Sequence, residues 1–162
     1  SIAKSTDGGK TFEMKDIGPG PSFYQICMYN RNIGVGMSGS DIFMTTDGWE
    51  TYDRISTSFS STYYNPIFIN EHTVQFACDR ANLIVLVNFD LNKKLWDIVY
   101  EFPKEVDFTF LDLKYTRNGM GFLAGLRRNG KGDRATDVMY QSTDYGKSWF
   151  RGRRVIDSSR PD

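Results

Sequence analysis

The sequence contains few of the residues on which many metal and disulfide functions depend. Among 162 residues there are two cysteines, Cys27 and Cys78, and one histidine, His72. Two cysteines cannot form a disulfide framework, so we expect buried free thiols, and one histidine excludes a multi-histidine metal site. The net charge of +0 excludes the positive field typical of proteins that bind nucleic acid. We therefore expect neither a metal nor a nucleic-acid partner.

Long apolar runs are also absent. The longest, residues 81–89, has the length of one buried strand, far below the roughly 18 residues that a membrane-spanning helix needs. No glycine-rich phosphate loop occurs, so we expect no cofactor. The chain is nevertheless 40% hydrophobic and 15% aromatic, which is enough for one globular core and excludes a disordered chain.

One short string recurs along the chain. Its frame is Ser/Thr-Thr-Asp, two turn-forming positions, a polar residue, Ser/Thr and an aromatic residue. Close copies occupy residues 5–12 (STDGGKTF), 45–52 (TTDGWETY) and 142–149 (STDYGKSW), and a weaker copy occupies 88–96 (NFDLNKKLW). Steps of 40, 43 and 54 residues separate the four aspartates, Asp7, Asp47, Asp90 and Asp144. A step of about 40 to 45 residues is the length of one four-stranded propeller blade.

We call the three close copies the aspartate turns. An aspartate can accept hydrogen bonds from nearby backbone amides, and glycine allows the positive φ that a reversal needs. The hydroxyl offers a further bond to the backbone, and the final aromatic residue is expected to re-enter the core. The four aspartates are therefore interpreted as structural residues rather than ligand contacts, and we expect Asp47→Ala and Asp144→Ala to lower stability.

The string resembles the Asp-box, or BNR repeat, of sialidases, sortilin-type receptors, some glycoside hydrolases and propellers similar to photosystem assembly factors. The longer match is residues 32–52 (NIGVGMSGSDIFMTTDGWETY), in which a glycine-rich strand precedes a strand ending in the string. Residues 120–126 (MGFLAGL) repeat the glycine-rich strand. The resemblance covers most of the chain and implies an all-β propeller of four-stranded antiparallel blades in a secreted or periplasmic protein. It implies no particular activity, because this repeat serves enzymes, receptors and assembly factors.

The strand pattern divides the propeller segment, residues 1–162, into blades. Residues 1–17 form half a blade, and 23–55, 63–102 and 106–156 form full ones, while no helical apolar period is present. Three and a half blades are fewer than most closed rings contain. The chain is either a four-bladed ring that borrows strands or, as we favour, a piece of a larger propeller. Two copies would give seven blades in a homodimer.

The connections of an antiparallel blade alternate between two faces of the ring. If the aspartate turns join third to fourth strands, the longer connections gather on the opposite face, which we call the long-loop face. Binding residues often lie on such loops. The candidates are two aromatic residues and three arginines suited to carboxylate or phosphate groups, namely Tyr63, Tyr64, Arg127, Arg128 and Arg134. The alternatives are that the tyrosines begin the next strand and that residues 127–137 form a solvated hairpin.

Signatures of catalysis are weak. A sialidase-like site needs an arginine cluster and a Tyr/Glu pair, and residues 54–56 read Arg-Ile-Ser where that family has Arg-Ile-Pro. A glycosidase needs two carboxylates, and none of the loop acids lies in a recognisable frame. The sequence thus favours a non-catalytic binding module that recognises a protein or glycan partner through the long-loop face. A glycoside hydrolase completed by further blades and an inhibitor or immunity-type protein are the alternatives.

Overall fold

The computed structural model describes residues 1–18, 22–39, 41–57, 63–80, 83–102, 108–127 and 136–152. Within these ranges every regular element is a β-strand, and all strand pairs are antiparallel. Blade 1 has two strands, β1 (Ile2–Lys4) and β2 (Glu13–Lys15). Blade 2 consists of β3 (Gln25–Met28), β4 (Gly34–Ser38), β5 (Asp41–Thr45) and β6 (Asp53–Ser56). Blade 3 consists of β7 (Tyr63–Asn70), β8 (Thr73–Arg80), β9 (Leu83–Asp90) and β10 (Leu95–Glu101). Blade 4 consists of β11 (Phe108–Tyr115), β12 (Gly121–Arg127), β13 (Thr136–Ser142) and β14 (Phe150–Arg151).

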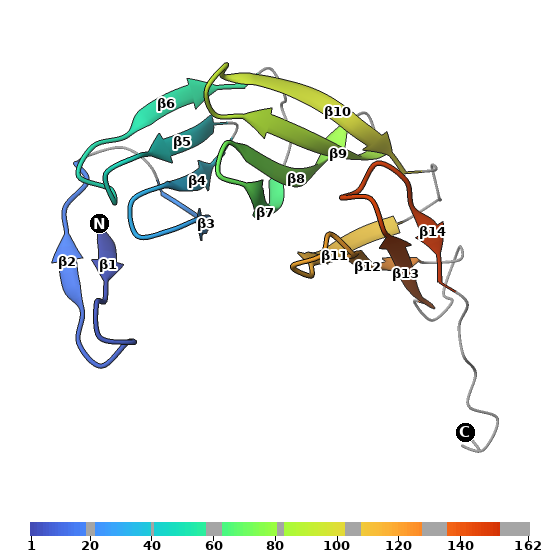
Figure 1. Ribbon diagram of the computed structural model, residues 1–162, viewed down its shortest axis with the longest axis horizontal. Coiled ribbons are helices and arrows are strands. Elements are labelled where there is room, and N and C mark those ends of the chain that lie inside the picture. The colour runs from blue at the N-terminus through green and yellow to red at the C-terminus, as the bar shows by residue number, and fades with distance from the viewer. Residues whose placement is uncertain are drawn as a thin grey trace.

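The four sheets follow one another along an open arc (Figure 1). Each sheet pairs its strands in chain order. The first strands β3, β7 and β11 lie on the concave side of the arc, where β3 contacts β7 and β7 contacts β11 (Figure 1). This radial arrangement of four-stranded sheets is that of propeller blades. The predicted all-β fold of about three and a half blades is confirmed, and the described residues contain no helix that could cross a membrane.

The hydrophobic cores lie between neighbouring blades. Side chains of β4 and β5 pack against β8 and β9 at the boundary of blades 2 and 3. A second cluster joins blade 3 to blade 4, and a smaller one joins blade 1 to blade 2. Because blade 3 is covered on both faces, β9 is buried almost continuously along its apolar run. The long apolar segment seen in the sequence is therefore one buried strand.

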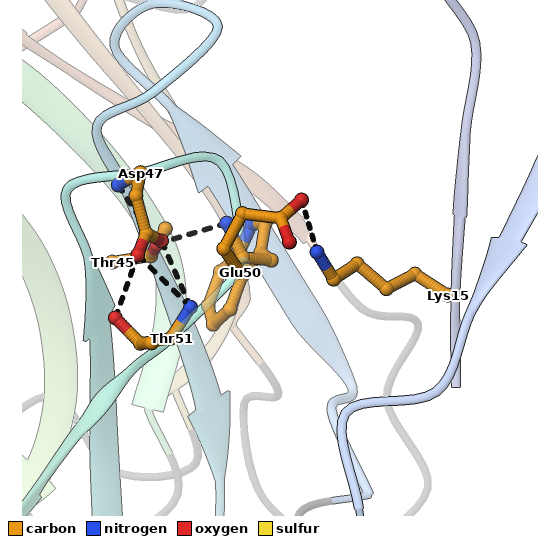
Figure 2. A network of polar contacts seen from close by, with 6 residues as sticks. Lys15, Thr45, Asp47, Glu50 and Thr51 are labelled. Carbon is orange, nitrogen blue, oxygen red and sulfur yellow. Dashed lines mark hydrogen bonds and ion pairs between the residues drawn. The ribbon is translucent and has the colours of Figure 1, made fainter.

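The aspartate turns join the third strand to the fourth in blades 1, 2 and 4. In blade 2 the Thr45 hydroxyl donates to Asp47 Oδ1 at 2.9 Å, and the Thr51 hydroxyl donates to Asp47 Oδ2 at 2.7 Å (Figure 2). The Thr51 amide donates to the same carboxylate at 2.9 Å. Matching bonds surround Asp7 and Asp144. Each turn is thus closed by hydrogen bonds within its own eight residues.

The two residues after each aspartate have positive φ in all three turns. Glycine occupies both positions in blade 1, whereas Trp49 (φ 70°) and Tyr145 (φ 57°) occupy one position each in blades 2 and 4. A left-handed backbone is unfavourable for such bulky residues. Trp49 is only 4% exposed and lies in the core between blades 1 and 2, so packing offsets the strain.

Each full blade ties the turn after its third strand to the turn between its first two strands. The Gly48 amide donates to the Asn32 carbonyl at 2.8 Å, and the Tyr145 amide donates to the Gly119 carbonyl at 3.3 Å. In blade 3 the Leu91 amide donates to the carbonyl of His72 at 2.9 Å. The two kinds of turn therefore share one face, as the sequence predicts. Most residues of the longer connections that the sequence assigns to the other face lie outside the described part of the chain.

The weaker copy of the string forms a different turn. Asp90 accepts the amides of Asn92 and Lys93 at 3.0 and 2.9 Å, and the Lys93 ammonium lies 3.3 Å from its carboxylate. Because this copy has no hydroxyl before its aromatic residue, the side-chain bond seen in the aspartate turns is replaced by an ion pair.

The expected burial of the final aromatic residue is wrong for Phe12, which is 63% exposed. This position faces the preceding blade: the Tyr52 hydroxyl donates to the Ile17 carbonyl, and Trp149 packs on Phe102 of blade 3. Phe12 lies in the first blade of the arc, where no described residue covers that side. Its exposure is thus set by position in the arc and not by the string.

Ion pairs bridge consecutive blades along the turn face. Lys15 of β2 pairs with Glu50 in the second aspartate turn (Figure 2). Lys94, in the turn after β9, pairs with Asp53 of β6 at 2.9 Å. In both cases the fourth strand of one blade thus contacts the turn after the third strand of the next blade. The strand carries the cation in the first pair and the anion in the second. Such exposed pairs contribute little to stability.

Candidate binding site on the innermost strands

The structure places three of the five sequence-predicted binding residues in strands. Tyr63 and Tyr64 are the first residues of β7, opposite Cys78 and Ala77, so they begin the strand rather than end the loop. Arg127 is the last residue of β12. Positions 63, 64 and 127 all lie at the long-loop end of their strands. The side chains of these three residues, and residues 128 and 134 entirely, lie outside the described part of the chain.

A polar network that the sequence analysis missed joins the innermost strands of all three full blades. The Gln25 side-chain amide donates to Asn65 Oδ1 at 3.1 Å, and the Asn65 backbone amide donates to Gln25 Oε1 at 2.8 Å. Asn65 Nδ2 donates to the carboxylate of Asp112. We call these three residues the inner-strand network. It crosses two blade boundaries on the concave side of the arc.

Irregular backbone positions the members of this network. The register of β7 shifts between Tyr64 and Ile67, and the register of β11 shifts between Phe110 and Asp112. Asn65 has φ 47°, a left-handed conformation that asparagine tolerates better than most residues. A β-bulge turns a side chain out of the ordinary alternation and is common next to functional sites. Two of the three network residues therefore lie at bulges.

The network ends in exposed charges. The Lys114 ammonium lies 3.4 Å from Asp112 Oδ1, and their side chains are 71% and 47% exposed. Asp112 also accepts the Leu113 amide at 2.9 Å. An ion pair this exposed adds little to stability. Because both side chains are exposed, the Lys114 ammonium and the Asp112 carboxylate are accessible to a ligand. Gln25 and Asn65, the other two members of the network, are half-buried.

Nucleophiles and acids are scarce on these strands. Asp112 is the only carboxylate of β3, β7 and β11, whereas hydrolysis of a glycoside requires two. Cys27 on β3 is a half-buried free thiol, less buried than the sequence led us to expect, and Cys78 is fully buried. Burial raises the pKa of the Cys27 thiol, which disfavours the thiolate. The described residues contain no group of three potential metal ligands.

The sequence carries one signal that could have indicated the network. Asn65 is followed by Pro66, and a proline within a strand pattern marks an edge or a bulge. Nothing in the sequence indicates that Gln25 or Asp112 lies beside this position.

We expect the aspartate turns to make the fold sensitive to acid. Hydrogen bonds from the hydroxyl residue four positions on hold the pKa of Asp7, Asp47 and Asp144 at about 2, below the usual 3.8. Because the folded-state pKa is the lower one, the stabilisation is complete above pH 3.8 and disappears as the pH falls towards 2. Thermal unfolding followed by circular dichroism should therefore show the melting temperature dropping across this window.

A variant pair tests the assignment to these turns. Asp144→Ala should lower the melting temperature by a few degrees at pH 7 and reduce its fall between pH 4 and pH 2. Asp97→Ala, on the exposed surface of β10, should change neither. Identical profiles for both variants would contradict a structural role for Asp144.

Comparisons with known proteins identify the fold. No protein-family model matches the chain, and a search of curated proteins found no match. A GH74 xyloglucanase from Xanthomonas campestris superposes with a TM-score of 0.57 at 12% identity, over 76% of this chain and 19% of that chain. YCF48 bound to D1 peptide gives 0.57 at 15% identity, over 81% of this chain and 39% of that chain. The chain spans less than two thirds of either structure, and at these identities the likeness concerns the fold alone. Both are β-propellers, and this chain is an all-β propeller segment of about three and a half blades.

Proposed function

We propose that this propeller segment is a non-catalytic binding module that binds an extended segment of a protein partner across its innermost strands, β3, β7 and β11. The observation that carries the proposal is the inner-strand network. Its amides, carboxylate and neighbouring ammonium combine donors and acceptors suited to the peptide groups and charged side chains of an extended chain.

Two further features support a protein ligand. Gln25 and Asn65 lie within the first three residues of β3 and β7, close to the predicted contacts Tyr63 and Tyr64. Tyrosine and arginine are enriched among the residues that dominate protein interfaces. YCF48, which shares the fold, was solved with a peptide bound. A glycan remains the competing ligand class, because the other structural neighbour is a xyloglucanase.

A selection experiment tests the proposed ligand class. The immobilised chain is screened against a displayed library of random linear peptides and, separately, against a glycan array. We expect enriched peptides, and we expect the double variant Asp112→Asn/Lys114→Gln to bind them at least about tenfold more weakly, the equivalent of 1.4 kcal/mol. The matched control Lys93→Gln, in the turn after β9, should bind normally. Enrichment of glycans alone, or equal binding by the double variant, would refute the proposal.

The predicted arginine contacts receive a separate test. We expect these three arginines to be solvated, so replacing Arg127, Arg128 and Arg134 together with alanine should leave the melting temperature unchanged, because solvated charges contribute little to stability. Binding of the selected peptides should weaken, most strongly for acidic sequences at low salt. An unchanged affinity for the selected peptides would show that these arginines do not contact the ligand, and the inner-strand network would then be the binding element.

A further inference from the structure

The hydrogen bonds of the inner-strand network have one fixed direction. A backbone N–H can only donate, so the Asn65 amide, 2.8 Å from Gln25 Oε1, fixes that atom as the acceptor. The Gln25 Nε2 group then donates to Asn65 Oδ1 at 3.1 Å, and Asn65 Nδ2 donates to the carboxylate of Asp112. Neither side-chain amide can be turned around without breaking one of these bonds. The network therefore leads from the backbone of β7 through two amides to one carboxylate.

The two carboxylate oxygens of Asp112 differ in their contacts. Oδ1 accepts hydrogen bonds from the Asn65 side chain and the Leu113 amide, and it is the oxygen closest to the Lys114 ammonium, at 3.4 Å. Oδ2 accepts no hydrogen bond from the residues that the structure describes. Because the Asp112 side chain is 47% exposed, Oδ2 is an acceptor that a ligand can reach.

Unused donors lie in the same network. Each side-chain amide carries two N–H bonds, and one of the two is used at Gln25 and at Asn65. The second N–H of each amide has no acceptor among the described residues. The Lys114 ammonium is paired with Asp112 and makes no hydrogen bond within the same part of the chain. The network thus offers several donors together with one free carboxylate oxygen.

This arrangement discriminates among the polar groups of a ligand. A guanidinium group binds a carboxylate most strongly through two parallel hydrogen bonds, one to each oxygen. Oδ1 of Asp112 already accepts two hydrogen bonds and lies near Lys114, so such a bidentate contact is blocked. A ligand carboxylate accepts the amide N–H groups but has no hydrogen to donate to Oδ2. A primary amide provides both functions on two atoms held in one plane, whereas a hydroxyl provides them on a single atom.

We propose that the inner-strand network recognises the side-chain amide of a glutamine or asparagine in the bound segment. The ligand NH2 group donates to Asp112 Oδ2, and the ligand carbonyl oxygen accepts the second N–H of Asn65 or Gln25. This inference rests on the proposed function and deepens it, because it names the side chain that the network selects in the extended segment. Asp112 is then the residue that determines specificity.

The backbone holds these groups in place before a ligand binds. Asn65 has φ 47° at the register shift of β7, and both its backbone and its side chain are bonded to Gln25. Asp112 lies at the register shift of β11, where the Leu113 amide fixes its Oδ1. Side chains that are already fixed lose little conformational freedom on binding, which favours affinity.

Matched short peptides test which group is selected. The probe is Ala-Ala-Gln-Ala-Ala with an acetylated N-terminus and an amidated C-terminus, and its counterparts carry glutamate, methionine, arginine or serine at the centre. Each is titrated into the isotopically labelled chain, and the side-chain NH2 signals of Gln25 and Asn65 are followed by NMR. We expect the glutamine peptide to shift these signals with an affinity of about millimolar. The glutamate, methionine and arginine peptides should bind at least about tenfold more weakly, because each lacks the donor or the acceptor.

One substitution should invert the preference. In Asp112→Asn the remaining side-chain oxygen still accepts the Asn65 and Leu113 donors, so an NH2 group replaces the free oxygen and presents a donor to the ligand. The glutamate peptide should then bind at least about tenfold more tightly than the glutamine peptide. The control Asp97→Asn changes the net charge equally on the exposed surface of β10 and should retain the preference for glutamine. Circular dichroism melting checks that both variants fold.

Four results would overturn the inference. They are no NMR shift with the glutamine peptide at millimolar concentration, equal affinity for its methionine counterpart, tightest binding of the arginine or serine peptide, and an unchanged preference in Asp112→Asn. Peptides selected from the displayed library that need neither glutamine nor asparagine would also overturn this inference and leave the proposed function standing. Enrichment of glycans alone refutes the proposed function, so the two failures are distinguishable.

Discussion

Trp149→Ala should lower the free energy of unfolding by about 3 to 5 kcal/mol, the range for removing a large buried aromatic side chain. Trp149 is 7% exposed in the core between blades 3 and 4. Its ring packs on Phe102 and Tyr115, with centroids 5.5 and 6.3 Å apart, and its indole N–H donates to the Gly146 carbonyl at 3.0 Å. The side chain thus fixes the short strand β14 and the third aspartate turn at once.

Urea unfolding followed by circular dichroism measures this effect, with Phe150→Ala as the control. Phe150 is the next residue and is 64% exposed, so its truncation should change stability by no more than about 0.5 kcal/mol. A loss below about 1 kcal/mol for Trp149→Ala would show that the boundary of blades 3 and 4 does not support the fold.

Gly146→Ala should cost about 3 kcal/mol, of which roughly 1 comes from the left-handed backbone and the remainder from overpacking. Gly146 has φ 82°, and a Cβ there would lie 2.7 Å from Leu86 Cδ2 and 3.1 Å from Gln75 Oε1. Gln75 is fully buried and accepts the Tyr115 hydroxyl while donating to the Tyr145 carbonyl at 3.1 Å. An added methyl group would disturb the hydrogen bonds of this buried polar network, and a buried polar group left without a partner lowers the free energy of unfolding.

The matched control is Gly9→Ala, at the same position of the first aspartate turn. Gly9 has φ 87°, but the nearest atom to an added Cβ is Phe12 Cζ at 3.8 Å. Only the backbone strain remains, so we expect a loss of about 1 kcal/mol. The difference between the two variants measures the packing between blades 3 and 4. Equal losses of stability in the two variants would show that the left-handed backbone alone accounts for the requirement for glycine at position 146.

The aspartate turns show what short-range chemistry can predict. The hydrogen bonds that the Thr45 and Asp47 side chains make in the second turn join residues no more than four positions apart, so eight residues of sequence suffice to anticipate them. The spacing of these turns also predicts the blades and the face that the turns share. The presence of a final aromatic residue, by contrast, did not predict its burial, because Trp149 packs on Phe102 of the preceding blade whereas no described residue covers Phe12 on that side.

The inner-strand network shows what such reasoning misses. Gln25 and Asn65 are 40 residues apart, and Asn65 and Asp112 are 47 apart, with a blade boundary inside each pair. Each residue looks like an ordinary polar position of a strand. Only the bulges and the left-handed backbone at Asn65 turn the three side chains towards one another.

The sequence by itself determined the all-β class, the blade repeat and the hydrogen-bonded turns, because these follow from residues that are neighbours in the chain. The tertiary structure alone decided where one blade meets the next, as in the Gln25–Asn65–Asp112 network and the packing around Gly146. Contacts between blades depend on the angle and register at which whole sheets pack. That geometry results from many weak interactions between residues far apart in the chain, so no single stretch of sequence predicts it.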